Sequence, residues 1–482
     1  MTAFTDFSHA PPNAIAVIVN DKRVTYRDFN THIDQVKNWL VSQGVSRTNT
    51  VGIFCKNPYW MWLLHIAALR LSCRHLTMLP NYAQIFAEQS GMDVFVGDIE
   101  ATQIASLDCK KIQFRPGDEL STDSTVVTTE AVDEMSSATV SGAERVAFTT
   151  GTTGEPKAVL WTADILNARL GQVGESKHLT QSTVLFCSLG METTAGFRYP
   201  LATWRQGGAV LLATNREWRQ KLVQGCSLAV FAPIQIKGEL SRSSGLWPRR
   251  EKRHLILLGG RAHQSLLASC YARVASSVSI AYGSTEAGSV VAGDARQARR
   301  HPGACGFVRT DCNVEIIDAQ GKQLPPGRRG MVRVRSPSIV AGYFSPQHHV
   351  QTSEAFRDGW FYPGDLGAKS EDGLVVILGR AADVANIGGR KLDFSDLEGR
   401  LNDVPEITDC CFINVDTEDD DKLLFLVATK QDDAWIRQTL FTTVGKLGPV
   451  SVIRVNSIPR NAMGKIPRNR IASRVKSALT KE

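Results

Sequence analysis

A short stretch of threonines and glycines is the first feature of the sequence that could bind an anion. It directly follows the apolar run 146–148. Glycines let the backbone turn tightly and bring its N–H groups close to an anion, and the terminal lysine suits phosphate oxygens. A flexible surface loop is the alternative, and a Walker-type loop fits poorly because no Ser or Thr follows the lysine. The residues of this candidate phosphate loop are Thr149, Thr150, Gly151, Thr152, Thr153, Gly154 and Lys157.

A second candidate segment, residues 281–286, follows another short apolar run. It therefore sits at the end of a strand, where open α/β sheets place their ligands. Tyr282 offers a flat face for a purine base, and Thr285 offers a hydroxyl to a phosphate. Glu286 offers a hard oxygen ligand for Mg²⁺. A polar loop with a solvated glutamate is the alternative; Gly283 and Ser284 complete the segment.

Two further segments could hold a ribose and a second cation. Asp365 lies on a turn flanked by glycines and could accept both hydroxyls of a ribose, while Arg380 could reach ribose or phosphate. A hairpin turn is the alternative for this segment. Lys465 follows Gly464 in a loop near the end of the chain, where a lysine taken alone would be solvated.

The elements that must position these residues alternate between strands and helices up to about residue 300. This alternation is typical of a parallel sheet covered by helices. Beyond it, residues 314–318 and 331–335 predict a hairpin-rich antiparallel region, with a further strand at 374–380. A boundary near residues 379–383 precedes a small α+β domain. The expected helices are 29–40, 60–71, 85–91 and 394–401, and the expected strands are 24–26, 51–54, 94–96, 184–186, 209–212, 228–231, 255–258, 410–415 and 423–428.

The composition excludes several classes of protein. Of 482 residues, 43% are hydrophobic and 21% charged, as in folded globular proteins and unlike disordered ones. The most apolar stretch, residues 60–71, is too short to span a bilayer. A net charge of +7 fits an anionic small molecule or an acidic protein partner better than a nucleic acid.

The cysteines and the N-terminus bear on the compartment. The ten cysteines are scattered, form no CxxC pair and include the adjacent Cys410 and Cys411, so we expect reduced thiols. The first residues show neither a basic nor an apolar segment of a secretory signal. A cytoplasmic location is therefore expected.

The four segments occur in the order and spacing of the adenylate-forming enzymes, a superfamily of acyl- and aryl-CoA synthetases, nonribosomal adenylation domains and beetle luciferases. The chain resembles this superfamily from residues 24–29 to the Lys465 loop, including residues 330–338, 342–343 and 383–391. The resemblance implies an α/β fold with two helix-covered, mostly parallel sheets and a small β-barrel-like part in residues 1–380. Residues 381–482 would form a small, mobile α+β lid that carries the catalytic lysine.

The resemblance also implies a two-step reaction. A carboxylate attacks the α-phosphate of Mg-ATP and gives an acyl- or aryl-adenylate and pyrophosphate; a pantetheine thiol, of CoA or of a carrier protein, then displaces AMP. The alternatives are an enzyme that acts without CoA, as a stand-alone adenylation domain does, one that stops at the adenylate or oxidises it, and a nucleotide-binding relative with reduced catalysis. The retention of Lys157, Glu286, Asp365 and Lys465 argues against the last of these.

The same resemblance assigns roles to individual residues. The threonine-rich loop would hold the β- and γ-phosphates, Thr285 the α-phosphate and Glu286 the Mg²⁺ ion. Lys465 would bridge the carboxylate and the α-phosphate. The other implied sites are an adenine border of Gly259, Gly260, Arg261 and Tyr282, a ribose site of Asp365 and Arg380, and a pantetheine tunnel at Gly388 and Gly389.

The chain departs from the family pattern at three positions. Ala382 stands where the hinge usually has Asp or Lys, Pro363 replaces the Thr of Thr-Gly-Asp, and Ala158 replaces the glycine after the loop lysine. These departures bear on the hinge and on the second step more than on adenylation.

The segment expected to line the acid pocket encodes the substrate only loosely. It lacks the Asp that holds an α-ammonium group in amino-acid-activating members, which disfavours an α-amino acid. We expect an aryl acid or a short-to-medium acyl chain, with CoA or a carrier protein as partner, no nucleic acid or membrane partner, and a monomer or homodimer. The expected pocket residues are Met191, Glu192, Thr193, Gly196 and Phe197.

Overall fold

The computed structural model describes most of the chain, namely residues 5–98, 104, 106–115, 143–150, 155–174, 179–242, 245–248, 250–387, 390–415, 422–445, 447, 449–460 and 466–479. Several predicted site residues lie outside this description: Gly151, Thr152, Thr153, Gly154, Gly388, Gly389, Lys465 and the side chain of Thr150.

The first of two large sheets has six strands in the order β6-β5-β3-β4-β7-β8. Its neighbours pair in parallel except β7 and β8, which are antiparallel. The predicted strands at 51–54 and 94–96 are confirmed here. The strands are β3 (Thr50–Phe54), β4 (Arg74–Thr77), β5 (Val94–Gly97), β6 (Lys110–Gln113), β7 (Glu144–Thr150) and β8 (Pro156–Trp161).

The second sheet has 15 strands and begins as a parallel sheet. Strands β1, β10, β9, β11, β12 and β13 pair in parallel in that spatial order, and β2 is antiparallel to β1. These strands are β1 (Ile15–Val19), β2 (Lys22–Thr25), β9 (Val184–Cys187), β10 (Ala209–Leu212), β11 (Leu228–Phe231), β12 (His254–Leu257) and β13 (Ser277–Ser284).

The predicted antiparallel region continues this second sheet. From β13 onward the order β13-β14-β15-β21-β20-β17 is antiparallel throughout, and β16 pairs with β17 in the expected hairpin. The strands are β14 (Gly288–Asp294), β15 (Ala304–Val308), β16 (Asn313–Ile317), β17 (Gly330–Arg335), β18 (Phe356–Arg357), β19 (Trp360–Phe361), β20 (Asp365–Lys369) and β21 (Leu374–Arg380).

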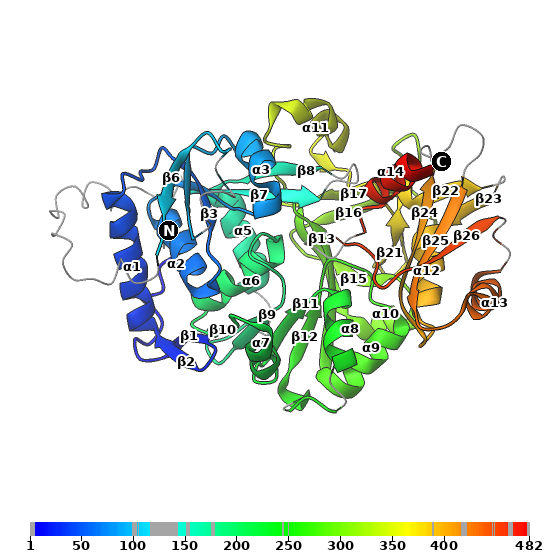
Figure 1. Ribbon diagram of the computed structural model, residues 1–482, viewed down its shortest axis with the longest axis horizontal. Coiled ribbons are helices and arrows are strands. Elements are labelled where there is room, and N and C mark those ends of the chain that lie inside the picture. The colour runs from blue at the N-terminus through cyan, green and yellow to red at the C-terminus, as the bar shows by residue number, and fades with distance from the viewer. Residues whose placement is uncertain are drawn as a thin grey trace.

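Four helices pack between the two sheets, in the blue-to-green half of Figure 1. They share one hydrophobic core with strands of both sheets. Helix α2 shows why: it is capped by Asn57, whose side chain accepts the N–H of Tyr59, and because it is apolar on nearly all sides, most of its residues are buried. The helices are α1 (Tyr26–Ser42), α2 (Pro58–Arg70), α5 (Ala163–Gly174) and α6 (Thr194–Arg205).

Other helices cover the outer faces of the sheets. In β11, Leu228 and Val230 face the central core whereas Ala229 and Phe231 face the outer one, as expected for a strand buried on both faces. Helix α3 (Ala83–Ser90) covers the first sheet. The second sheet is covered by α7 (Arg216–Val223), α8 (Pro233–Arg242), α9 (Gln264–Ser269) and α10 (Ala295–Arg300), and α11 (His349–Ala355) precedes β18.

The C-terminal region, orange to red in Figure 1, has sheets and hydrophobic clusters of its own. The division into domains 1–380 and 381–482 stays a prediction. The elements are β22 (Val384–Ile387), β23 (Arg390–Asp393), α12 (Phe394–Asn402), β24 (Ile407–Val415), β25 (Lys422–Thr429), α13 (Asp433–Val444), β26 (Val450–Arg454) and α14 (Arg468–Leu479).

The architecture confirms the predicted α/β fold class, with its two helix-covered sheets and smaller C-terminal part. All ten cysteines are free thiols. In the described part of the chain, no helix is both long enough and apolar enough to cross a membrane.

Candidate active site

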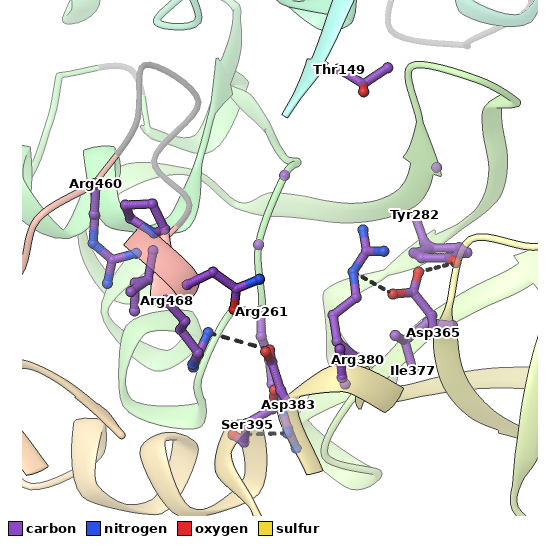
Figure 2. A pocket seen from close by; sticks show the side chains of 18 of the residues that line it. Thr149, Arg261, Tyr282, Asp365, Ile377, Arg380, Asp383, Ser395, Arg460 and Arg468 are labelled. Carbon is purple, nitrogen blue, oxygen red and sulfur yellow. Dashed lines mark hydrogen bonds and ion pairs between the residues drawn. The ribbon is translucent and has the colours of Figure 1, made fainter. Parts of the chain in front are cut away.

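A cavity of about 790 Å³ lies where the two sheets, the antiparallel strands and the C-terminal region meet. In Figure 2, Tyr282, Asp365 and Arg380 lie on one side of it, and Arg460 and Arg468 lie on the other. The predicted site residues that line it are Thr149, Glu192, Gly259, Gly260, Arg261, Tyr282, Gly283, Asp365 and Arg380.

Asp365, Arg380 and Tyr282 form a connected group at this cavity. Asp365 begins β20 and Arg380 ends β21, where the two residues are direct cross-strand partners. Arg380 Nε lies 2.8 Å from Asp365 Oδ1, and Tyr282 Oη donates to Asp365 Oδ2 at 2.5 Å, as the dashed lines in Figure 2 mark. Burial, and then the Asp365 carboxylate, raise the pKa of Tyr282. The phenol therefore keeps its proton and orients Asp365 as an acceptor.

A second charged group lies beside the candidate phosphate loop. Thr149 and Lys157 are cross-strand partners in β7 and β8, and both side chains are buried. Lys157 Nζ lies 4.6 Å from the ring centroid of Tyr343, and Tyr343 Oη donates to Glu286 Oε1 at 3.4 Å. Burial lowers the pKa of Lys157, and the Glu286 carboxylate acts in the opposite direction. The structure thus places Thr149 and Lys157, from the candidate phosphate loop, near Glu286, from the segment 281–286.

The backbone of Thr285 and Glu286 is held by an arginine that the sequence analysis missed. Arg169 of α5 is fully buried and donates to the carbonyls of Thr285 (2.9 Å), Glu286 (3.1 Å) and Ser338 (2.8 Å). Arg169 therefore holds the backbone that carries both predicted side chains. The sequence did contain a signal for Arg169, because it is a charged residue among the apolar positions of a helix.

The adenine border predicted from the sequence also lines the cavity. Gly259, Gly260 and Arg261 follow β12. A Cβ atom at Gly283 would lie 2.0 Å from the carbonyl oxygen of Gly288, so β13 and β14 approach too closely for any side chain there. The Ser284 hydroxyl instead accepts the N–H of Ala287, which makes it part of the turn.

The expected acid-pocket residues do not gather at the cavity. Thr193 caps α6, since its hydroxyl accepts the N–H of Gly196 at 2.9 Å and donates to the carbonyl of Gly190. Phe197 is fully buried against Trp62. Met191 belongs to the central core. Only Glu192 among the five expected residues lines the cavity.

Arg145 borders the cavity beside Glu192 and was not anticipated from the sequence. It is 1% exposed, and its guanidinium lies 3.8 Å from the ring centroid of Phe197. Nη2 donates to Thr77 Oγ1 (3.0 Å) and to the carbonyl of Met191 (2.8 Å). Burial lowers the pKa of Arg145 to about 9, against the opposing effect of Glu192, so the side chain stays charged at neutral pH. Burial raises the pKa of Glu192.

The C-terminal region contributes arginines on both sides of the undescribed Lys465 loop. Arg460 pairs with Asp409 at 2.8 Å. Arg468 pairs with Glu398 at 2.6 Å and with Asp383 at 3.3 Å, the latter drawn in Figure 2. Asp383 adjoins Ala382, so Arg468 ties α14 to the predicted hinge.

Comparisons with known proteins identify the family to which the chain belongs. A 3-hydroxybenzoate–CoA ligase of Aromatoleum sp. (strain CIB) is 24% identical, over 96% of this chain and 94% of that protein. Enterobactin synthase component E of Escherichia coli (strain K12) is 23% identical, over 96% and 92%. The ATP-bound structure of MatB from Rhodopseudomonas palustris is similar with a TM-score of 0.82 at 22% identity, covering 99% of both chains. The family model described as "AMP-binding enzyme" matches residues 4–344. This chain is therefore a member of the AMP-binding enzyme family, as its motifs had predicted.

Proposed function

We propose that this enzyme is an ATP-dependent acid–thiol ligase, which joins a carboxylic acid to a pantetheine thiol through an acyl- or aryl-adenylate. The observation that carries the proposal is the convergence of residues from β7, β13, β20, β21 and the C-terminal region on one cavity. The CoA ligase among the relatives supports the same reaction class.

The ribose of ATP would bind at Asp365. A carboxylate offers about four acceptor positions, and Arg380 and Tyr282 occupy one on each oxygen. Acceptor capacity thus remains on both oxygens for the two ribose hydroxyls. Because these partners hold the carboxylate in place, nucleotide binding needs little rearrangement there.

The triphosphate would lie between Lys157 and the threonine-rich loop, with Glu286 as the carboxylate for Mg²⁺. Mg²⁺ in nucleotide sites uses one or two carboxylates together with phosphate oxygens. The described residues contain no cluster of three or more His, Cys, Asp or Glu that could hold a metal alone. A single buried Glu286 fits an ion that arrives with ATP and is shared with its phosphates.

In the first step a carboxylate oxygen of the acid attacks the α-phosphorus, and the bond from that phosphorus to the bridging oxygen breaks, releasing pyrophosphate. Both reactants are anions, so the barrier falls when cations are held where charge develops. Lys465 would supply one such cation from the C-terminal region. Arg460 and Arg468, which flank its loop, already border the cavity.

In the second step the thiol sulfur attacks the acyl carbon, and AMP leaves with the electron pair of the broken carbon–oxygen bond while the thiol proton passes to solvent. The C-terminal region would rotate about Ala382 so that Gly388 and Gly389 line the pantetheine path, a hinge motion. The acceptor would be CoA, with a carrier protein as the alternative.

ATP–pyrophosphate exchange with a panel of aryl acids and short-to-medium acyl acids tests the adenylation step. We expect exchange that depends on both Mg²⁺ and the acid. If no acid supports exchange while ATP still binds, the chain is a nucleotide-binding relative and not a ligase.

A second assay separates the acceptors. The acid that gives the fastest exchange is incubated with CoA and, in parallel, with a pantetheinylated carrier protein. Thioester formation with CoA alone supports a CoA ligase; formation on the carrier alone supports the alternative. Adenylate release with neither acceptor contradicts the transfer step.

A further inference from the structure

We propose that the acid carries an uncharged hydroxyl group, which is held between Arg145 and Glu192 where β7 borders the cavity. This inference rests on the proposed function, because it describes the acid used by the same site. Both side chains line the cavity. Neither is part of the nucleotide motifs.

Arg145 has hydrogen-bond donors that no described residue uses. Nε and Nη1 of Arg145 have no hydrogen-bond partner among the described residues, although the side chain is 1% exposed. A buried guanidinium with unpaired N–H groups is costly unless a ligand completes it. These N–H groups belong to a side chain that borders the cavity, and both nitrogens are enclosed, so a ligand completes them only if the side chain shifts toward the cavity.

Arg253 is an arginine of this chain whose three donor nitrogens are all used. Arg253 is equally buried, yet all three of its nitrogens donate to backbone carbonyls, of Cys226 (3.1 Å), Val274 (2.8 Å), Gln224 (2.7 Å) and Pro248 (2.9 Å). It does not line the cavity. Arg145 makes two hydrogen bonds to described residues, both from Nη2: one to the Thr77 hydroxyl and one to the carbonyl of Met191.

Glu192 is the hydrogen-bond acceptor that borders the cavity beside Arg145. The Glu192 carboxylate is folded over Gly190, where a Cβ atom would lie 2.2 Å from Glu192 Oε1. It interacts electrostatically with Arg145, but Nη2 of Arg145 is occupied by Thr77 and Met191 and the other nitrogens are unpaired. Both residues border the cavity, and the described contacts include no ion pair or hydrogen bond between them.

The substrate group that suits both Arg145 and Glu192 is a hydroxyl. A hydroxyl both accepts and donates, so it can accept from Arg145 and donate to Glu192. A second carboxylate would meet Glu192 as a like charge, which is unfavourable. An unsubstituted acid would leave both charged groups unpaired, and sites built to bind a hydroxyl reject analogues that lack it.

Direct binding of non-reactive acyl-adenylate mimics, in which a sulfamate replaces the phosphate, tests the inference by isothermal titration calorimetry. One set carries benzoyl, the three hydroxybenzoyl isomers and the three carboxybenzoyl isomers; another carries hexanoyl, 6-hydroxyhexanoyl and 5-carboxypentanoyl. In at least one set we expect a hydroxylated mimic to bind roughly 10- to 100-fold more tightly than its unsubstituted and carboxylated counterparts.

Variants show which residues create this preference. Arg145→Met should reduce the preference to less than about 3-fold, and Arg145→Lys should retain part of it. Arg198→Met is the matched control: Arg198 is also buried with Nε and Nη1 unpartnered among the described residues, but does not line the cavity. Glu192→Gln should improve binding of the carboxylated mimic relative to the hydroxylated one by about 10-fold, because a like charge is removed.

The outcomes separate the inference from the proposed function. Equal affinities for all mimics, a preferred carboxylated mimic, or equal weakening of every mimic by Arg145→Met would each overturn the inference while leaving adenylate binding intact. If no mimic binds, the proposed function fails and the inference with it. Should Arg145→Met not fold, Arg145→Lys, Glu192→Gln and the wild-type ratio still decide.

Discussion

The nucleotide part and the acid part of the cavity differ in how far the protein satisfies its own polar groups. Around Asp365, the carboxylate already has Arg380 and Tyr282 as partners. Around Arg145, two nitrogens remain without partners in the described chain. The nucleotide part is therefore preorganised before its ligand binds. In the acid part, by contrast, a group on the substrate must supply the missing hydrogen-bond partners.

The largest effect should come from removing the lysine that would complete the nucleotide part. We expect Lys465→Ala to lower pyrophosphate release by roughly 10²- to 10³-fold, because a positioned charge at the reacting phosphate is lost. Thioester formation from a supplied acyl-adenylate should remain near wild type. Pyrophosphate release equal to that of wild type would show that the cavity is complete without the lid.

Asp365→Ala tests whether the preorganised group binds nucleotide. We expect the KM for ATP to rise roughly 10- to 100-fold, because charged hydrogen bonds to ribose are lost and Arg380 loses its ion-pair partner. Glu315→Ala is the matched control: Glu315 and Arg333 form an equivalent cross-strand pair, 2.5 Å apart, in β16 and β17 outside the cavity. A similar rise in both variants would mean that the Asp365 pair only stabilises the sheet.

The sequence allowed candidate site residues to be predicted mainly where they are contiguous in the chain. The segment at the end of β13 and the Asp365 turn were predicted from a few contiguous residues, and Tyr282 and Asp365 line the cavity; the loop after Thr150 lies outside the described residues, and the functional roles stay predictions. Their roles were supplied by resemblance. Which side chains share one cavity depends on strand order, which spacing along the chain does not reveal.

The acid part was harder for a physical reason. Arg145 acts with Thr77 and Met191, which lie 68 and 46 positions away along the chain, and nothing in its own neighbourhood marks it. Thr193 was expected in the pocket, although a threonine just before an apolar helix is a capping signal, and capping is the role that the structure gives it. Local rules recover caps and turns; long-range polar contacts require the fold.

Tyr282→Phe tests a smaller contribution to the nucleotide part. It removes one donor from Asp365 while keeping the aromatic face and the Arg380 pair. Because one hydrogen bond is worth about 0.5–1.5 kcal/mol, we expect the KM for ATP to rise roughly 2- to 12-fold with kcat little changed. An effect as large as that of Asp365→Ala would indicate that the hydroxyl alone positions the carboxylate.

The smallest effect concerns the histidines behind Arg145. His65 and His75 are fully buried, with ring centroids 5.1 Å apart. Burial lowers the pKa of both rings, and Arg145 lowers it further. In the unfolded chain they take up protons near pH 6.5, so the folded state loses stability as pH falls below that value.

His75→Leu removes one of these groups. Between pH 7.5 and pH 6.0, we expect the free energy of unfolding of the variant to gain roughly 0.8 kcal/mol relative to wild type, as measured by urea denaturation. Leu76→Ala, on the same strand, removes buried apolar volume without a titratable group, so its larger loss of about 2–5 kcal/mol should not vary with pH. If the difference for His75→Leu is also independent of pH, the pKa of His75 is the same in the folded and unfolded states, and the region around Arg145 is more polar and better hydrated than its burial indicates. A hydroxyl on the acid would then compete with water there, which would weaken the contrast between the two parts of the cavity.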